Sequence, residues 1–292
     1  MRTFSLLLSV LLLSFQSPPA PPPAATNTQA VAALQKALAA LAPSVAIKDV
    51  TLSGAVRRIA GSDDETGTVT IKGAQGLGSR MDLSLPSGPR TEVCNTSSVA
   101  FVGSWSGPDG ASHAAAYHNL LGDPGWSPAL TLASLLSAPN AAISYVGPEA
   151  RDGQSVLHLT ASQAFPSITG DTAKLMQHLT QIDIFLDATT SLPVAFAFNM
   201  HPDNAANLDI PAELRFSDYR LVSGTQIPFH IRKFVNNSLA LDLQFTSATI
   251  NSGLSSAEFS IPAAALATPT DLSFPAPAIP TEICCSRQTG PC

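Results

Sequence analysis

The sequence predicts an α+β fold, mainly antiparallel β, in which a strongly curved sheet wraps around one N-terminal helix. Apolar residues follow a helical spacing near the N-terminus, whereas most of the remaining chain alternates between apolar and polar residues. Short turn sequences separate the alternating runs, and they favour antiparallel pairing because parallel strands need long crossovers. Hydrophobic residues make up 45% of the chain, and few long helices are available to cover them. The sheet must therefore curl, close or stack.

Residues 1–25 are predicted to be a secretory signal peptide followed by a proline-rich spacer. Arg2 supplies the positive charge, and residues 5–15 form an apolar run that is shorter than the roughly 20 residues of a membrane-spanning helix. Cleavage is expected between Ala20 and Thr26. No cysteine follows the apolar run to accept a lipid. The protein is thus predicted to be exported, periplasmic or extracellular, soluble and not membrane-spanning.

The folded domain is predicted to span residues 26–262 and to begin with a helix. Thr26, Asn27 or Thr28 can cap this helix, and Pro43 ends it. One apolar stripe at helical spacing runs along it: Val31, Leu34, Leu38 and Leu41. From residue 48 the period changes to two, which predicts strands at residues 50–59, 68–72, 80–85 and 99–105, with turns at 61–67, 73–78 and 86–89.

Two short helices are predicted to interrupt the strands in the middle of the chain. The first covers residues 127–136, with Ser127 as the N-cap before a proline and Pro139 beyond its end; the second covers residues 171–179. Strand-like alternation then returns at residues 182–186, 194–198, 227–231 and 239–245. Residues 263–292 form a Pro/Ala/Thr-rich tail that is expected to be extended.

The second half of the chain also carries a family resemblance. Residues 182–193 (IDIFLDATTSLP) form a strand–turn–strand pattern, and residues 216–262 contain three further strands. The marks of these strands are Tyr219, Gly224, Ile227-Pro228, Asn251, and Phe259 followed by Pro262. In this order the motifs resemble the LolA/LolB/LppX-like superfamily, which includes outer-membrane lipoprotein carriers. The resemblance covers roughly residues 28–262 and is strongest over residues 182–262.

The resemblance implies an incomplete β-barrel whose open side is plugged by short helices. It also implies an apolar cavity for the acyl chains of lipids or lipoproteins, where each CH₂ gains about 0.8 kcal/mol. An arginine inside the barrel would control the lid, and Arg57 and Arg58 are the candidates. The predicted function is therefore non-enzymatic binding of an acyl chain. The alternative is a module with a filled core and no ligand, which interacts with or senses an envelope protein or peptide.

The predicted ligand-binding residues are apolar strand positions and two tryptophans: Leu83, Trp105, Trp126, Ile184, Phe196, Phe198, Leu241, Leu243 and Phe245. Residues at period two share one face of a strand, so the strand residues line a cavity or pack on the N-terminal helix as ordinary core. The two tryptophans flank a Gly/Pro/His-rich stretch. Residues 105–136 are accordingly either a mobile lid at the barrel mouth or a surface loop anchored by two rings.

The four cysteines are candidates for disulfides: Cys94, Cys284, Cys285 and Cys292. Four cysteines allow three pairings. A bond between the adjacent Cys284 and Cys285 would close a strained ring, which favours a bond from Cys94 to one of them. The tail spacing matches no common zinc site.

No catalytic residue, cofactor or metal site is predicted. Residues 103–107 place Trp105 where a G-x-S-x-G motif requires serine, and the glycines at 73–78 do not form a dinucleotide fingerprint. The acidic run at 63–65 lies in a predicted turn, where charge is normally solvated. His113 and His118 point to opposite faces of a strand, and the other histidines are isolated in sequence. A net charge of −6 predicts no nucleic-acid partner.

Overall fold

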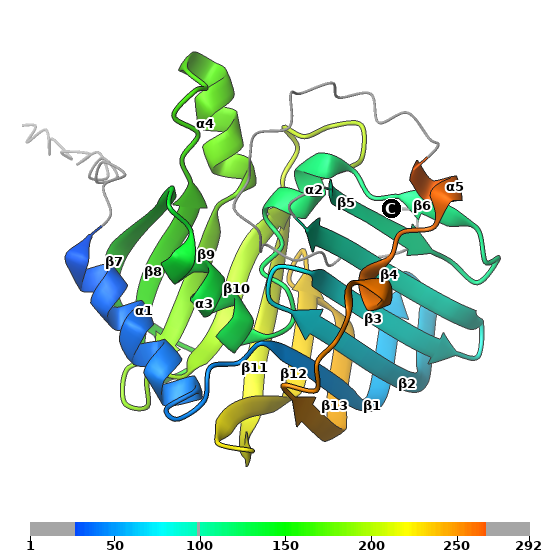
Figure 1. Cartoon of the computed structure of the whole chain (residues 1–292), viewed down its shortest axis with the longest axis horizontal. Helices are drawn as coiled ribbons and strands as arrows, with labels where there is room; N and C mark the ends of the chain where they lie inside the picture. The colour runs from blue at the N-terminus through cyan, green and yellow to red at the C-terminus, as the bar shows by residue number, and fades with distance from the viewer. Residues whose placement is uncertain (1–26, 98–99, 267–292) are drawn as a thin grey trace, which may run out of the picture.

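Thirteen antiparallel strands form one open, strongly curved sheet in the computed structural model, which describes residues 27–97 and 100–266 (Figure 1). The strands are β1 (Asp49–Ala60), β2 (Asp63–Ala74), β3 (Gly78–Leu85), β4 (Gly88–Ser97), β5 (Ala100–Ser106), β6 (Ser112–Ala114), β7 (Ala141–Arg151), β8 (Gln154–Gln163), β9 (Ile182–Asp187), β10 (Pro193–Met200), β11 (Ile210–Val222), β12 (Thr225–Val235) and β13 (Ser238–Ile250). The helices are α1 (Thr28–Leu41), α2 (Tyr117–Leu121), α3 (Pro128–Ser137), α4 (Gly170–Leu179), η1 (Ser256–Phe259) and α5 (Ala263–Leu266).

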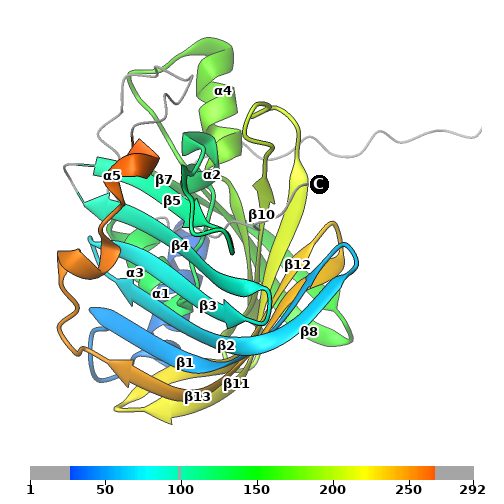
Figure 2. The same ribbon diagram turned by 90° about the vertical axis from the view of Figure 1, so that its right-hand side faces the viewer.

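Two strand meanders join at a single long-range pairing. The order across the sheet is β6-β5-β4-β3-β2-β1-β13-β12-β11-β10-β9-β8-β7, so only the β1–β13 pair connects strands distant in sequence. A bulge between Ser53 and Gly54 interrupts this pair, and a Cβ on Gly54 would lie 2.2 Å from the Gln244 carbonyl oxygen. Bulges increase the local bend of a sheet. The predicted strongly curved antiparallel sheet, an incomplete barrel, is confirmed (Figure 2).

The helices α1 and α3 lie on the concave face of the sheet (Figure 1). Asn27 caps α1 by accepting a hydrogen bond from the Gln29 backbone N–H at 2.8 Å, and the helix ends before Pro43, as predicted. The buried stripe of α1 is shifted from the predicted one and consists of Ala30, Leu34, Ala37 and Leu41. The predicted helices at residues 127–136 and 171–179 correspond to α3 and α4.

The predicted turn at residues 61–67 is wrong. Only residues 61–62 turn, and the acidic run from Asp63 onward belongs to β2. Cross-strand ion pairs explain the difference: Arg57 of β1 binds Asp64 at 2.6 Å, and Arg58 lies 3.8 Å from Glu65. Opposite charges on neighbouring strands favour pairing, so this hairpin extends through a segment whose charge suggests a solvated loop.

Several strands were not predicted: β4, β6, β7, β8 and the part of β11 before residue 216. The physical reason differs among them. In β4 the positions that face the concave side carry Arg90 and Glu92, so the apolar alternation is lost. In the edge strand β7, Gly147 and Pro148 lie at a bulge, and such residues weaken the strand pattern.

The residues that mark the family resemblance hold strand ends together. The Tyr219 hydroxyl of β11 donates to the Pro193 carbonyl of β10 at 2.8 Å. Asn251, just after β13, accepts from the Lys48 N–H at 2.7 Å and donates to the Ala46 carbonyl at 3.1 Å, beside the start of β1. Phe259 is fully buried against Val93 on the outer face. The Asn251 contacts secure the junction between the two meanders, whereas the Tyr219 bond ties β11 to β10 and Phe259 covers the outer face.

Asp49 secures the same junction with a buried carboxylate. It accepts hydrogen bonds from the Ser252 N–H at 2.7 Å, the Ser252 hydroxyl at 2.9 Å and the Gly253 N–H at 2.9 Å. Burial alone would raise the pKa of Asp49, but these donors hold the pKa below its ordinary 3.8. The ionised form is therefore the form that stabilises the fold.

Replacing Asp49 with asparagine is expected to lower the free energy of unfolding at pH 7 by about 1.5–3 kcal/mol, because bonds to a charged acceptor are lost. A group whose folded pKa is depressed contributes fully above its unfolded pKa. The difference between wild type and Asp49→Asn should thus be complete above pH 3.8 and vanish as the pH falls through the lower folded pKa. Urea unfolding at several pH values measures it. Asp171→Asn, at a carboxylate that is 98% exposed, is the control and should change stability little.

The predicted signal peptide and spacer, and most of the predicted tail, lie outside the described residues. Within the part that is described, residues 263–266 form the short helix α5 rather than extended chain. No helix among the described residues has the length and apolarity needed to cross a membrane.

Candidate functional site

The concave face of the sheet is a continuous apolar surface. Alternating residues of β1, β2, β3 and β8 to β13 point into one buried cluster. The predicted lining residues that belong to it are Leu83, Trp126, Ile184, Phe196, Phe198, Leu241, Leu243 and Phe245. The sequence thus predicted which residues share this face, and the structure brings them together. The same cluster contains residues of the helices α1 and α3, so these side chains pack as an ordinary core.

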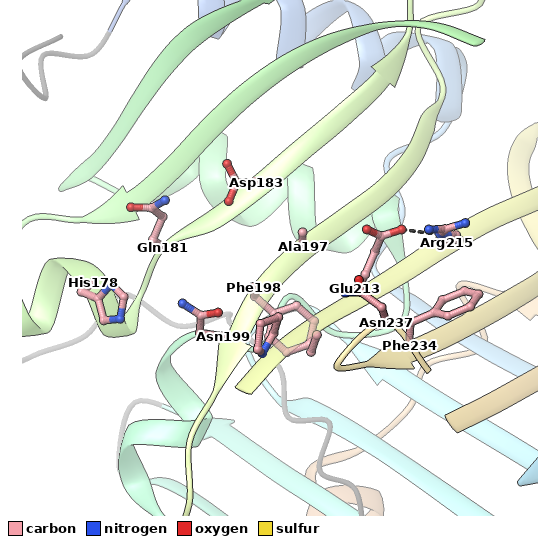
Figure 3. Close-up of a pocket in the computed structure, with 12 residues that line it drawn as sticks. His178, Gln181, Asp183, Ala197, Phe198, Asn199, Glu213, Arg215, Phe234 and Asn237 are labelled. Atoms are coloured by element: carbon pink, nitrogen blue, oxygen red, sulfur yellow. Dashed lines mark hydrogen bonds and ion pairs between the residues drawn. The ribbon is translucent and has the colours of Figure 1, made fainter. Parts of the chain in front are cut away.

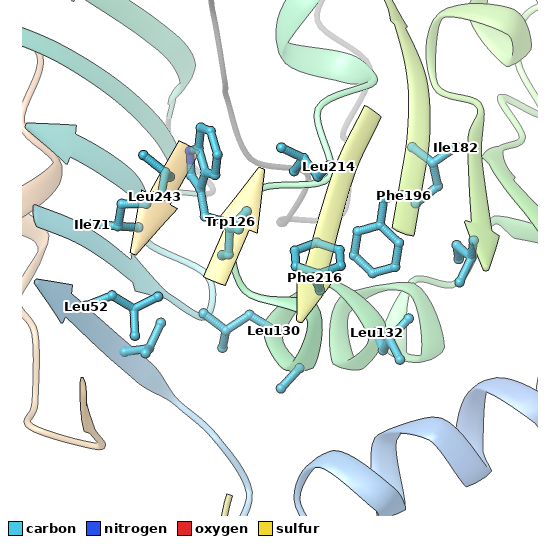
Figure 4. Packing of buried hydrophobic residues seen from close by; sticks show 14 of the residues in the cluster. Leu52, Ile71, Trp126, Leu130, Leu132, Ile182, Phe196, Leu214, Phe216 and Leu243 are labelled. Carbon is cyan, nitrogen blue, oxygen red and sulfur yellow. The ribbon is translucent and has the colours of Figure 1, made fainter. Parts of the chain in front are cut away.

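Helix α3 fills the concavity. Seven of its ten residues are buried, and Leu130, Leu132 and Leu135 carry its apolar contacts with the sheet. Figure 4 shows Leu130 facing Leu52 of β1, with Leu132 farther along the helix on the side of Phe196. A cavity of only about 20 Å³ remains between α3 and the strands β1 and β2. This volume is far below the several hundred Å³ of a ligand site.

The hydroxyl groups of α3 are satisfied within their own segment. Thr131 donates to the Pro124 carbonyl, and Ser134 donates to the Leu130 carbonyl at 2.9 Å. A helix interior that buries hydroxyls needs such partners, since an unsatisfied buried polar group is costly. Because Pro124 lies in the loop before α3, the Thr131 bond also ties the helix to that loop.

The two candidate tryptophans occupy different environments. Trp126 is 3% exposed and lies in the core cluster immediately before α3. Trp105 is only partly buried on β5, where its ring stacks on His113 at 4.3 Å. Trp105 is absent from the cluster formed by the other eight candidates. The pair thus does not flank the concavity as two equivalent anchors.

A buried charge cluster lies at one end of the concave face, and of its members the sequence analysis named only Arg58. It consists of Arg58, Arg90, Glu92, Asp123 and Lys233. Arg58 is 4% exposed, Glu92 6%, Asp123 1% and Lys233 1%. The Lys233 ammonium lies 5.9 Å from the Trp126 ring centre.

Electrostatic effects connect the members of the buried charge cluster. Burial lowers the pKa of Lys233, and the carboxylates of Glu92 and Asp123 oppose this effect. Burial and the neighbouring Arg90 also lower the pKa of Arg58. Of the two candidate lid arginines, Arg58 thus faces the interior, whereas Arg57 is half-exposed and paired with Asp64.

Helix α2 is joined to the loop between β10 and β11. The Asn119 side chain donates to the His201 carbonyl at 2.7 Å and accepts from the His201 N–H at 2.8 Å. His118 makes a further bond to the Pro202 carbonyl at 3.0 Å. Burial of the Tyr117 hydroxyl raises its pKa to about 12. Hydrogen bonds therefore anchor α2 to this loop, whereas α3 makes apolar contacts with the sheet.

Cys94 is buried and carries a free thiol, so the expected disulfide from Cys94 to Cys284 or Cys285 is not formed in this structure. Ala115, Leu120 and the ring of Tyr117 cover it from the side of α2. The remaining candidates, Cys284, Cys285 and Cys292, lie outside the described residues.

A separate pocket of about 410 Å³ lies on the outer face of β9 to β11 (Figure 3). Its walls are polar at many positions and include His178, Asp183 and Glu213. Glu213 forms ion pairs with Arg151 and Arg215 there. The ion pairs and polar walls of this pocket suit an acyl chain less well than the apolar concave face, which remains the candidate site.

No protein-family model and no curated protein matches the chain. Several solved structures do match the chain. An outer-membrane lipoprotein-sorting protein domain from Vibrio parahaemolyticus is 11% identical, with a TM-score of 0.50 over 79% of this chain and 96% of that one. A LolA superfamily protein from Nitrosomonas europaea is also 11% identical, with a TM-score of 0.50 over 79% and 97%.

A DUF1329 family protein from Desulfovibrio piger is similar at 11% identity, with a TM-score of 0.52 over 79% of this chain and 97% of that one. At such identities the likeness concerns the path of the backbone. The chain has a LolA-like fold.

Proposed function

We propose that this protein binds the acyl chain of a lipid or lipoprotein on the concave face of its sheet and releases it without chemistry. The observation that supports this proposal is the position of α3, an apolar helix that lies on the apolar concave face of a LolA-like half-barrel. In this closed form α3 takes the place of the ligand. An incoming acyl chain would replace the contacts of α3 with the sheet.

The free energy needed to withdraw α3 from the concave face is comparable to the free energy gained by burying an acyl chain there. Withdrawing Trp126, Leu130, Leu132 and Leu135 from the concave face costs about 6–12 kcal/mol, at about 1.5–3 kcal/mol for each side chain. A 16-carbon chain gains about 12 kcal/mol on burial, and an 8-carbon chain about 6 kcal/mol, at about 0.8 kcal/mol per CH₂. Displacement of α3 is therefore more favourable for long chains than for short ones.

The hinge of this movement is placed between α2 and α3, at residues 122–127. Gly125 has φ of 66°, a conformation that glycine adopts without strain. Asp123 accepts from the Gly125 N–H at 2.8 Å and belongs to the buried charge cluster with Lys233. The bonds of Asn119 to His201 hold α2 in place while α3 moves.

The second candidate function is an interaction module without a ligand, for an envelope protein or peptide. The residual cavity of about 20 Å³ favours it, since the concave face is already filled. In this case α3 stays packed on the concave face, and the outer surfaces of the molecule contact the partner.

A series of fatty acids from 8 to 18 carbons separates the two functions. In a Trp105→Phe background, Trp126 is the single tryptophan and reports the environment of α3. We expect saturable binding only for the longer chains, accompanied by a red shift of Trp126 emission as the ring leaves the core. Mass spectrometry of the gently isolated protein should also detect a bound lipid.

The interaction module predicts a different outcome. The emission of Trp126 would not change at any chain length, and the isolated protein would contain no hydrophobic ligand. The same result would contradict the carrier proposal. Guanidinium unfolding provides the reference for the emission of fully exposed Trp126.

A further inference from the structure

Three side chains with metal-binding groups converge beside α4, outside the concave site. His178 comes from α4, and His201 and Asp209 come from the loop between β10 and β11. One donor atom of each lies within 4.8 Å of the other two. The His178 Nε2 atom lies 2.8 Å from an Asp209 oxygen, and the His201 Nδ1 atom lies 3.6 Å from the same oxygen. These histidines are isolated in sequence, and only the fold brings them together.

One ring nitrogen of His201 lacks a hydrogen-bond partner at this site. Its side chain is 1% exposed. The Nδ1 atom lies 3.2 Å from the Leu208 carbonyl oxygen, whereas the buried Nε2 atom has no hydrogen-bond partner. A neutral imidazole has one N–H and one lone pair, so either tautomer leaves Nε2 unsatisfied. Because the Leu208 carbonyl oxygen can only accept, Nδ1 carries the proton and Nε2 is the ring nitrogen available to an ion. A buried ring nitrogen without a partner calls for an explanation such as an ion.

We propose that His178, His201 and Asp209 bind a divalent transition-metal ion, with Zn²⁺ as the best match. Two imidazoles and one carboxylate are a donor set typical of zinc, whose bonds to nitrogen and oxygen are about 2.0–2.2 Å long. Donors at this bond length lie roughly 3.3 Å apart in a tetrahedral site. His178 and Asp209 are 42% and 41% exposed, so their side chains are free to adjust around the buried His201.

The exposure of two ligands also leaves one side of the ion open to water. Catalytic zinc sites have three protein ligands and an open position, whereas structural sites are closed by four. The carboxylate of Asp209 and the ring of His178 form the open side, and His178 also lines one end of the outer pocket (Figure 3). The site is therefore expected to exchange its ion with solution.

A surface ion pair is the ordinary explanation for a histidine beside an aspartate. Two such pairs occur elsewhere in the described chain: His158 with Asp183 and His230 with Asp242, each at 2.8 Å. In the described residues, neither of these pairs belongs to a group of three metal-binding side chains within reach of one ion. The buried second imidazole thus distinguishes the proposed site, and His230 provides a matched control.

The test uses the full chain without an affinity tag, after removal of metal and alkylation of accessible thiols. Calorimetric titration with Zn²⁺ should give one site per chain. His178→Ala and Asp209→Asn should each weaken binding at least tenfold, since even the loss of an outer-shell partner costs about 10–100-fold. His230→Ala should bind as the wild type does. Co²⁺ should give a visible absorption spectrum that both ligand variants lose.

Both ligand variants change partly exposed side chains, so their melting temperatures without metal should match that of the wild type. Zn²⁺ should raise the melting temperature of the wild type and of His230→Ala only. The absence of a Zn²⁺ site would overturn the proposal. Binding that survives unchanged in His178→Ala and Asp209→Asn would overturn it too, because the ion would then occupy other residues.

Discussion

Replacing Asp123 with alanine is expected to lower the free energy of unfolding by about 3 kcal/mol, because it removes one partner from a buried charge cluster. Losses of about 3–5 kcal/mol are usual when a buried pair is broken. The lower value is expected here since Glu92 still opposes the effect of burial on the pKa of Lys233. Urea unfolding at pH 7, followed by tryptophan fluorescence, measures the loss.

Asp109→Ala is the matched control for Asp123→Ala. Both aspartates accept a hydrogen bond from the backbone N–H two residues later, Ala111 in one case and Gly125 in the other. Asp109 lies in an exposed loop, so its replacement should cost less than about 1 kcal/mol. Equal losses in the two variants would contradict a role for Asp123 in stabilising Lys233.

The same substitution also tests the proposed lid. If Asp123 and Lys233 help to hold α3 closed, Asp123→Ala lowers the free energy needed to open it. Long fatty acids should then bind more tightly to Asp123→Ala than to the wild type, while Asp109→Ala shows no gain. Weaker or unchanged binding would place the hinge elsewhere.

The second large effect is expected for Phe196→Ala, which should lower the free energy of unfolding by about 3–5 kcal/mol. The Phe196 side chain is fully buried, and its ring meets that of Phe216 edge to face at 5.0 Å. Deleting it removes buried apolar surface and leaves a cavity between the sheet and α3 (Figure 4). Calorimetric or urea unfolding measures the effect.

Phe234→Ala provides the control on the opposite face of the sheet. Phe234 is only partly buried, and the guanidinium of Arg215 lies 4.4 Å from its ring centre. Its loss should cost about 1 kcal/mol, since such contacts at exposed sites contribute about 0.5–1 kcal/mol. If Phe196→Ala were no more destabilising than Phe234→Ala, Phe196 would line an open cavity instead of closing the core.

Local patterns predicted much of the framework. The cap at Asn27 and the end before Pro43 delimit α1, and the Ser127-Pro128 pair marks the start of α3. These signals act within a few residues, so they can be recognised in the sequence before the fold is known. Alternation also predicted correctly that residues such as Phe196 and Leu243 share the concave face, because the side-chain period of a strand is a local property.

Alternation failed where the interior is polar. In β4, Arg90 and Glu92 occupy positions that point toward the concave face, and the strand therefore lacks an apolar pattern. The acidic start of β2 was predicted to be part of a turn because it lies between Gly61 and Gly67, in a sequence typical of turns. The partners of its acidic residues, Arg57 and Arg58, lie on the neighbouring strand of the hairpin.

Local patterns in the chain were enough to predict the mainly antiparallel architecture, the N-terminal helix and the set of apolar residues that line the concave face. The filling of this face by α3, which leaves about 20 Å³, and the meeting of His178, His201 and Asp209 beside α4 became visible only in the folded molecule. The two kinds of feature differ in the sequence distance over which they are set. Helix caps and strand periods depend on neighbours in sequence, whereas the filling of a cavity and the convergence of donor atoms depend on how distant segments pack.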